Sequence, residues 1–210
     1  MDITMNNNPI IYDPSNEFGI CFAQTRDTLM DTEIYKRFIY NIDNKFRRSQ
    51  FWRDYKQHLY DLGLYRDQRH ASITSEMVDL EAHHHMISLE YMTIMITEHL
   101  LNYKGCVTTF EVLQELEEAH RNNQVCIIIL DETEHQKYHS DPSEFISIRQ
   151  CFGFPFDFIS KYIDGMTLDI SFKLLLQLKQ EEQYNGSFSP SEVKARDQIL
   201  SWQMYNNNNY

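Results

Sequence analysis

Residues 124–139 read QVCIIILDETEHQKYH. The first part, residues 124–130, is rich in β-branched side chains and has the length of one buried strand. Asp131, Glu132 and Glu134 follow at once, and the positive end of a helix dipole favours carboxylates on the first turn. The stretch therefore predicts a buried strand that leads directly into a helix running toward His139.

A second strand is predicted upstream, at residues 77–84, where apolar and polar residues loosely alternate. Two helices are predicted between the strands, at about residues 88–103 and 110–120. Thr108-x-x-Glu111 is a capping-box pattern for the second of these helices. The two strands are thus separated by a helical insertion.

The rest of the chain is divided by its composition and hydrophobic pattern. A helix capped by Asp31 or Thr32 is predicted to run to about Leu62. Glu181 and Glu182 are interpreted as part of a solvated helix face. The expected organisation is an irregular N-terminal arm at 1–31, a helical segment with a basic patch at 32–70, a core of two strands and a helix with a helical insertion at 71–140, a C-terminal helical region at 141–205, and a polar tail at 206–210. The predicted fold class is α+β, predominantly helical.

Composition excludes several classes of protein. The chain has 210 residues and a formal net charge of −12, which excludes a protein that is basic all over. A hydrophobic content of 42% excludes a wholly disordered chain. No stretch approaches the roughly 18 apolar residues of a membrane span, and the N-terminus lacks the basic and apolar regions of a secretory signal. We therefore expect a soluble intracellular protein without a membrane partner.

The four cysteines, Cys21, Cys106, Cys126 and Cys151, form no C-x-x-C pair. In a chain without a signal peptide, scattered cysteines are expected to be free, buried thiols. This pattern argues against disulfides and against a cysteine-type zinc finger.

The nine histidines are spread unevenly. Three are consecutive, His83-His84-His85, and two more form His135-x-x-x-His139. His135 and His139 lie one helical turn apart, so their Cβ atoms share a face at about 5–6 Å. Such a pair suits a borderline divalent ion such as Zn²⁺. Adjacent residues of a regular strand point to opposite faces, so His83 and His84 are expected to do different jobs.

The ordered set of these residues resembles the HNH, or ββα-metal, nucleases. It comprises Leu80-Glu81-Ala82-His83-His84, then Asn122-Asn123-Gln124-Val125, then Asp131 to His139. The resemblance implies an embedded HNH-like ββα motif that clamps one divalent metal ion, with Zn, Mg and Mn all open. His84 would be the general base, Asn123 would fix the loop that orients it, and His83, His135 and His139 would hold the metal. The upstream Arg48-Ser49 and the strand–helix order also look like HNH-like proteins of large tailed bacteriophages.

Two features of this assignment stay open at the level of sequence. The triplet allows His84 and His85 to be the active pair instead, and Asn122 competes with Asn123 for the structural role. The histidines can also be read as an ordinary polar strand end and a solvated helix face.

Positive charge is concentrated in one segment. Residues 36–69 hold nine Lys and Arg against four Asp, a local net charge of +5, which leaves −17 for the remainder. Aromatic residues are interleaved with this charge, as in many nucleic-acid-binding elements. The candidate phosphate contacts are Lys45, Arg47, Arg48, Arg53 and Lys56. The same pattern also fits an amphipathic helix with a solvated basic face.

Two functions follow from these observations. The first is a metal-dependent, HNH-like nuclease that hydrolyses phosphodiester bonds, with DNA as the expected nucleic-acid partner. The second is a non-catalytic phage structural or interaction protein that retains the HNH-like fold and binds phage or host proteins. The expected location is the cytoplasm of an infected bacterial cell or the virion.

Overall fold

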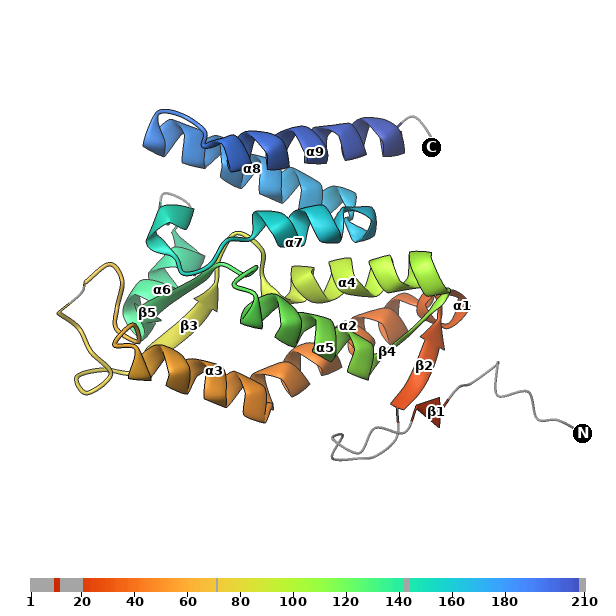
Figure 1. Cartoon of the computed structure of the whole chain (residues 1–210), viewed down its shortest axis with the longest axis horizontal. Helices are drawn as coiled ribbons and strands as arrows, with labels where there is room; N and C mark the ends of the chain where they lie inside the picture. Colours follow the sequence, from red (N-terminus) through yellow and green to blue (C-terminus); the bar gives the residue numbers. More distant parts are fainter. Residues whose placement is uncertain (1–9, 12–20, 71, 142–143, 208–210) are drawn as a thin grey trace, which may run out of the picture.

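The computed structural model describes residues 10–11, 21–70, 72–141 and 144–207 (Figure 1). The elements in chain order are β1 (Ile10–Ile11), β2 (Cys21–Thr25), α1 (Arg26–Leu29), α2 (Thr32–Arg48), α3 (Gln50–Asp61), β3 (Leu80–His84), α4 (Leu89–Lys104), β4 (Cys106–Thr108), α5 (Thr109–Arg121), β5 (Ile127–Asp131), α6 (Glu132–Ser140), η2 (Ile148–Gln150), α7 (Phe156–Lys161), η3 (Ile163–Gly165), α8 (Leu168–Asn185) and α9 (Pro190–Asn207). The strands form two small sheets, β1-β2-β4 and β3-β5. The predicted α+β class, predominantly helical, is confirmed.

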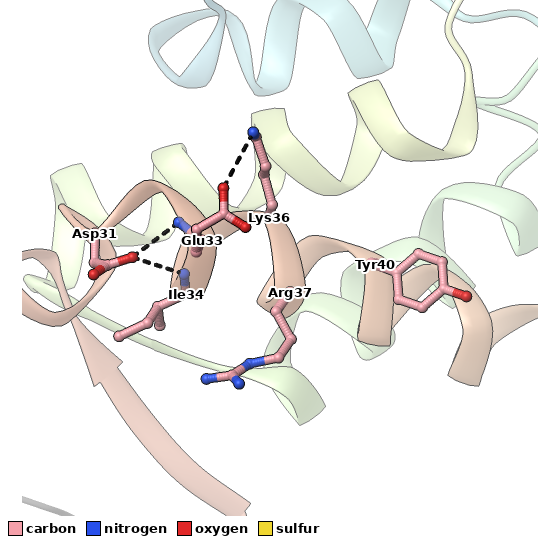
Figure 2. A pocket seen from close by; sticks show the side chains of 6 residues that line it. All are labelled: Asp31, Glu33, Ile34, Lys36, Arg37 and Tyr40. Atoms are coloured by element: carbon pink, nitrogen blue, oxygen red, sulfur yellow. Dashed lines mark hydrogen bonds and ion pairs between the residues drawn. The ribbon is translucent and has the colours of Figure 1, made fainter.

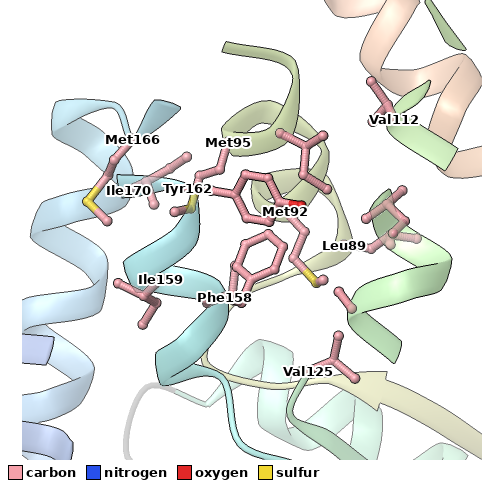
Figure 3. Close-up of a cluster of buried hydrophobic side chains, with 14 of the residues drawn as sticks. Leu89, Met92, Met95, Val112, Val125, Phe158, Ile159, Tyr162, Met166 and Ile170 are labelled. Atoms are coloured by element: carbon pink, nitrogen blue, oxygen red, sulfur yellow. The ribbon is translucent and has the colours of Figure 1, made fainter. Parts of the chain in front are cut away.

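Helix α4 runs through the middle of the main core. The Ser88 side chain caps its first turn by accepting a hydrogen bond from the Tyr91 N–H, and Gly105 ends it in the left-handed conformation at φ 73°. Buried side chains of α4 face α7 on one side and α5 on the other (Figure 3). Helix α7 in turn lies between α4 and the α8–α9 hairpin (Figure 1). The helices thus stack in layers around α4.

Strand β5 is buried on both faces. Ile127 and Ile129 belong to the main hydrophobic core. Ile128 and Leu130 form a second, smaller cluster with Ile146. Because successive strand residues point to opposite faces, an unbroken run of apolar residues is what a strand with two buried faces requires. The prediction made from residues 124–130 is therefore confirmed, and the strand leads directly into α6.

Both edges of β5 are also hydrogen-bonded. On one edge β3 pairs antiparallel with β5, with His83 opposite Ile128. On the other edge Phe152 and Ile127 exchange backbone hydrogen bonds of 2.7 and 2.9 Å. Further along that edge, the Gln68 N–H donates to the Ile129 carbonyl at 3.0 Å. A strand so covered has no free edge to present to solvent.

Asp67 lies at the end of the β5 edge that does not pair with β3, which we call the outer edge. Its side chain is fully buried and accepts three backbone hydrogen bonds, from Arg69 (2.8 Å), His70 (2.6 Å) and Asp131 (2.8 Å). A buried carboxylate needs such donors to offset its lost hydration. The segment after α3 is therefore bound to the strand that organises the core.

The structure corrects several predicted elements. The helix predicted over residues 32–62 is two helices, because Ser49 adopts extended backbone angles and its hydroxyl caps α3 by accepting from the Trp52 N–H at 3.0 Å. The arm predicted to be irregular contains β2 and α1, while residues 1–9 and 12–20 lie outside the described ranges. The short strand β4 was not foreseen, since its three residues carry too little pattern.

The interpretation of Glu181 as part of a solvated face is wrong. Its side chain is buried and accepts hydrogen bonds from the Ser147 hydroxyl (2.8 Å) and the Ile148 N–H (2.6 Å). Burial raises the pKa of this carboxyl group, while these hydrogen bonds lower it. Glu182, its neighbour, is exposed. Glu181 thus holds α8 against η2.

We expect Asp67→Ala to lower the free energy of unfolding by about 3 kcal/mol, because three backbone N–H groups lose their acceptor. Urea denaturation followed by circular dichroism measures the change. Asp61→Ala is the matched control, since Asp61 is exposed and accepts a single hydrogen bond among the described residues, from the Gln57 side chain. Equal stability of the two variants would contradict the role given to Asp67.

Candidate functional site

The histidine triplet is divided between the two faces of β3. His83 packs against α6, where its ring centroid lies 5.2 Å from that of Tyr138. His85, just after the strand, contacts the same tyrosine at 5.8 Å between ring centroids. His84 lies on the opposite face and stacks on Trp52 of α3 at 5.4 Å. The alternation expected from sequence therefore separates the implied metal ligand from the implied base.

The first cluster is built from β3 and α6. His83 Nδ1 and His135 Nε2 are 3.0 Å apart, and the Glu81 carboxylate lies 2.5 Å from His135 Nδ1. Because the carboxylate accepts from Nδ1–H, the neutral His135 ring presents a lone pair at Nε2. A carboxylate that orients a histidine in this way is the usual outer partner of a metal-binding histidine. The two facing nitrogens can share a proton or a cation.

His85 extends this cluster toward the interior. Its Nδ1 lies 3.2 Å from the Tyr138 hydroxyl, and its ring hydrogen-bonds the backbone of Ile146. Burial lowers the pKa of His85 to about 4, although the bond to Ile146 opposes the shift. His85 is therefore a neutral packing residue near pH 7.

The second cluster is a buried histidine pair on the α3–α5 side. His84 Nε2 and His120 Nε2 are 2.9 Å apart, and His120 Nδ1 donates to the Leu116 carbonyl at 2.6 Å. His120 Nε2 must then accept, so His84 Nε2 donates and His84 Nδ1 is left as a bare acceptor. That atom has no hydrogen-bond partner among the described residues.

Aromatic rings enclose this pair. His120 contacts Phe46 at 4.8 Å and Tyr55 at 5.4 Å between ring centroids. His84 is only 6% exposed. Burial is the main cause that lowers the pKa of His120 to about 4 and the pKa of His84 well below its ordinary value. Both rings are therefore neutral near pH 7.

The remaining implied site residues are placed as follows. Asn123 follows the last turn of α5 at φ 54°, a left-handed conformation that asparagine tolerates, and its carbonyl accepts from the Phe154 N–H at 2.7 Å. Asn122 is the C-cap of the same helix. The side chain of His139 lies outside what the structure describes. In the described residues, no group of three or more His, Cys, Asp or Glu is arranged to hold a metal ion.

The predicted phosphate contacts lie around the junction of α2 and α3. Lys45, Arg47 and Arg48 occupy the last turn of α2, where cations offset the helix dipole. Arg53 donates to the Arg48 carbonyl at 2.6 Å and so closes the end of that helix. Lys56 is half-buried on α3.

Two of the aromatic residues interleaved with these cations are buried and cannot stack on bases. Phe46 is fully buried and Trp52 is 5% exposed. Both belong to the group of rings around the buried histidine pair. This arrangement favours the interpretation as an amphipathic helix pair with a solvated basic face.

Two hollows on the described surface contain none of the predicted site residues. The larger lies over the start of α2 and measures about 560 Å³ (Figure 2). There Asp31 caps the helix through the N–H groups of Glu33 and Ile34, and Glu33 pairs with Lys36 at 3.5 Å. Its polar groups are largely engaged by one another.

Sequence reasoning missed three partners of the histidines. Glu81 stands two residues before His83, so the period of a strand was enough to place it on the same face. Tyr138 follows His135 by three residues on one helix, and residues with this spacing lie on the same face, so the sequence also indicated this partner. His120 carries no such signal, because only the packing of α5 against β3 and α3 brings it to His84.

Comparison with known proteins now places the chain. A family model described as Bacteriophage G278-like virion protein matches residues 3–205. The chain belongs to this virion protein family. No curated protein and no solved structure matches the chain. Membership of the G278-like virion family supports a phage origin and association with the virion, whereas it gives no support to the HNH nuclease resemblance.

Two further expectations for this virion protein concern membrane-spanning helices and the state of its cysteines. Among the residues that the structure describes, no helix is long and apolar enough to cross a bilayer. Cys106, Cys126 and Cys151 are free thiols, as the sequence predicts, but of the three only Cys126 is buried, and the side chain of Cys21 lies outside the description.

We expect the protein to lose stability as pH falls from about 6.5 toward 4. The unfolded chain protonates His85 and His120 at their ordinary pKa near 6.5, whereas the native state resists protonation down to about 4. The contribution of these two rings to the free energy of unfolding is thus fully present above pH 6.5. At pH 4.5 each ring has lowered the free energy of unfolding by roughly 2–3 kcal/mol. Urea denaturation at pH 7.5 and 4.5 measures the loss.

Variants identify the groups responsible for this pH dependence. His120→Gln should lose less stability between the two pH values than the wild type, because one resisting ring is gone. His58→Gln, at an exposed position of α3, should keep the full loss. A pH dependence unchanged by His120→Gln would show that the buried pair is not its source.

Proposed function

We propose that the protein is a non-catalytic component of the phage particle that docks onto another virion protein through its α8–α9 hairpin. Membership of the virion protein family supports the location. The observation that carries the docking is an exposed apolar row on α8, made of Leu168, Phe172 and Leu176, which are 40%, 60% and 58% exposed. These residues recur every four positions and so lie along one side of the helix.

The row lies on the side of α8 away from the core. Buried Ile170, Leu174 and Leu178 form the inner row, two residues out of step with the outer one. Two residues on a helix are about 200° apart, so the two rows face in opposite directions. A helix with apolar residues on both sides, at the surface of a water-soluble domain, is typical of a protein–protein contact.

The hairpin is held firmly enough to present this row. Gln203 of α9 donates to the Ser171 hydroxyl of α8 at 2.8 Å. Ser160 of α7 donates to Gln198 of α9, also at 2.8 Å. A rigid apolar face loses little conformational entropy on binding. The protein's net charge of −12 also suits a protein partner better than a nucleic acid.

We expect Phe172→Asp to reduce incorporation of the protein into phage particles by about tenfold or more, because a charge would be buried in the contact. Immunoblots of purified particles, assembled in cells that supply the variant, measure incorporation. Tyr103→Asp is the matched control, since Tyr103 is 80% exposed on α4 and is not part of the row on α8. Normal incorporation of a folded Phe172→Asp protein would rule out docking through α8.

A second candidate function is a metal-dependent nuclease, favoured by one observation. His83 and His135 face each other at 3.0 Å with Glu81 behind His135, an arrangement that suits part of a divalent metal site. His139, on the same helix as His135, would be the third ligand implied by the resemblance. The implied base, His84, is buried on the other face of β3, which is why this function stands second.

If the nuclease proposal holds, wild-type protein binds one Zn²⁺ or Mn²⁺ in calorimetry and nicks plasmid DNA. His135→Ala should then lose the metal, while His84→Ala should keep the metal and lose cleavage. His58→Ala, an exposed position, is the control for both measurements. Absence of metal binding by the wild type would end this proposal and leave the docking function untouched.

A further inference from the structure

A hollow of about 220 Å³ lies beside the outer edge of β5. Its lining residues are Leu64, Arg66, Asp67, Gln68, Gln150 and Phe152. They come from two segments far apart in the chain, each fixed to β5 at a different residue: Gln68 at Ile129 and Phe152 at Ile127. The walls of the hollow are therefore held by the sheet and do not depend on a ligand.

The two glutamine side chains have fixed orientations. Gln68 Oε1 accepts from the Ile129 N–H at 2.8 Å, and Gln150 Oε1 accepts from the Ser147 N–H at 3.0 Å. Because each amide oxygen is held by a backbone donor, each NH₂ group must take the other position. No described residue accepts a hydrogen bond from either NH₂ group, so the N–H donors of both side chains are available to a ligand.

Arg66 adds a cation to these donors. Its guanidinium makes no ion pair or side-chain hydrogen bond with any described residue, whereas nearby Arg69 bridges Glu134 and Glu144 at 3.0 and 2.7 Å. A guanidinium offers paired N–H groups that match the two oxygens of a carboxylate. The acidic group in the lining, Asp67, is already engaged by three backbone N–H groups.

We propose that this hollow binds a carboxylate at the C-terminus of a partner polypeptide. Arg66 and the amide groups of Gln68 and Gln150 would hold the two oxygens, while Leu64 and Phe152 contact the apolar part of the terminal residue. The volume suits one residue rather than a nucleotide. Arg66 and Asp67 together give a lining of no net charge, which suits a single negative charge better than a doubly charged phosphate. This contact is separate from docking through α8.

The test is an NMR titration of the ¹⁵N-labelled full-length protein, with the side-chain NH₂ signals of Gln68 and Gln150 as the readout. The probes are acetyl-Gly-Ala-Leu with a free C-terminus, the same peptide as its C-terminal amide, sodium acetate, and inorganic phosphate. We expect saturable shifts with the free-acid peptide and about tenfold weaker binding of the amide. Acetate should shift the same signals more weakly, because it lacks the apolar residue.

Two variants and one control complete the experiment. Arg66→Gln should weaken binding of the acid peptide about tenfold. Gln150→Glu keeps an acceptor for the Ser147 N–H but replaces the donors by a negative charge, so it should abolish binding. Arg149→Gln removes an exposed cation next to Gln150 that does not line the hollow, and it should bind like the wild type.

Several results would overturn the proposal. These are equal binding of acid and amide peptides, tighter binding of phosphate than of the acid peptide, full affinity in a folded Arg66→Gln protein, or no saturable shift up to about 20 mM peptide. None of these results bears on incorporation through α8. Failure here and failure of the docking function are therefore distinguishable.

Discussion

The burial of β5 on both faces and both edges is the constraint on which the rest of the structure depends. Its side chains separate the main core from the smaller cluster under α6. Its backbone holds β3 on one edge and two irregular segments, at Gln68 and Phe152, on the other. Since unpaired buried backbone groups are costly, these segments are fixed as strictly as the strand. This arrangement fixes the positions of the residues that form the histidine clusters and the hollow beside the sheet.

Local signals in the sequence were enough for much of the fold. The apolar run ending at Leu130, the carboxylates on the first turn of α6 and the capping box at Thr108 each act within a few residues, and the structure has all three. The break at Ser49 is made by a local cap that the prediction of one continuous helix overlooked. The burial of Asp67 and Glu181 depends on distant segments, so no local pattern could reveal it. The residues of the candidate site divide in the same way into those that a local pattern places and those that only tertiary packing brings together. Strand period and helix period account for Glu81, His83 and His135, whereas the pairing of His84 with His120 is purely tertiary.

The fold gives a structural explanation for the positive charge and the aromatic residues of the basic segment, residues 36–69. Most of the segment with a local charge of +5 is a helix pair, in which Phe46 and Trp52 are buried beside the histidine pair. Four of its cations, Lys45, Arg47, Arg48 and Arg53, lie at the end of α2. Exposed apolar side chains occur on several elements, and on α8 three of them, Leu168, Phe172 and Leu176, line up along one side of the helix. A virion component needs durable contacts with neighbouring proteins, and that is the role we propose for the exposed row on α8. Membership of the virion protein family fits such a role better than it fits a nuclease.

The distance between β3 and β5 along the chain governs how the protein can fold. About forty residues separate the two strands, and the entropy lost on closing such a loop grows with its length. That loop contains α4 and α5, which cap themselves locally and pack against each other. Their association shortens the gap that the strands must bridge. We therefore expect the helical pair to form first on the folding pathway and the sheet to close afterwards, with the segments at Gln68 and Phe152 locking last.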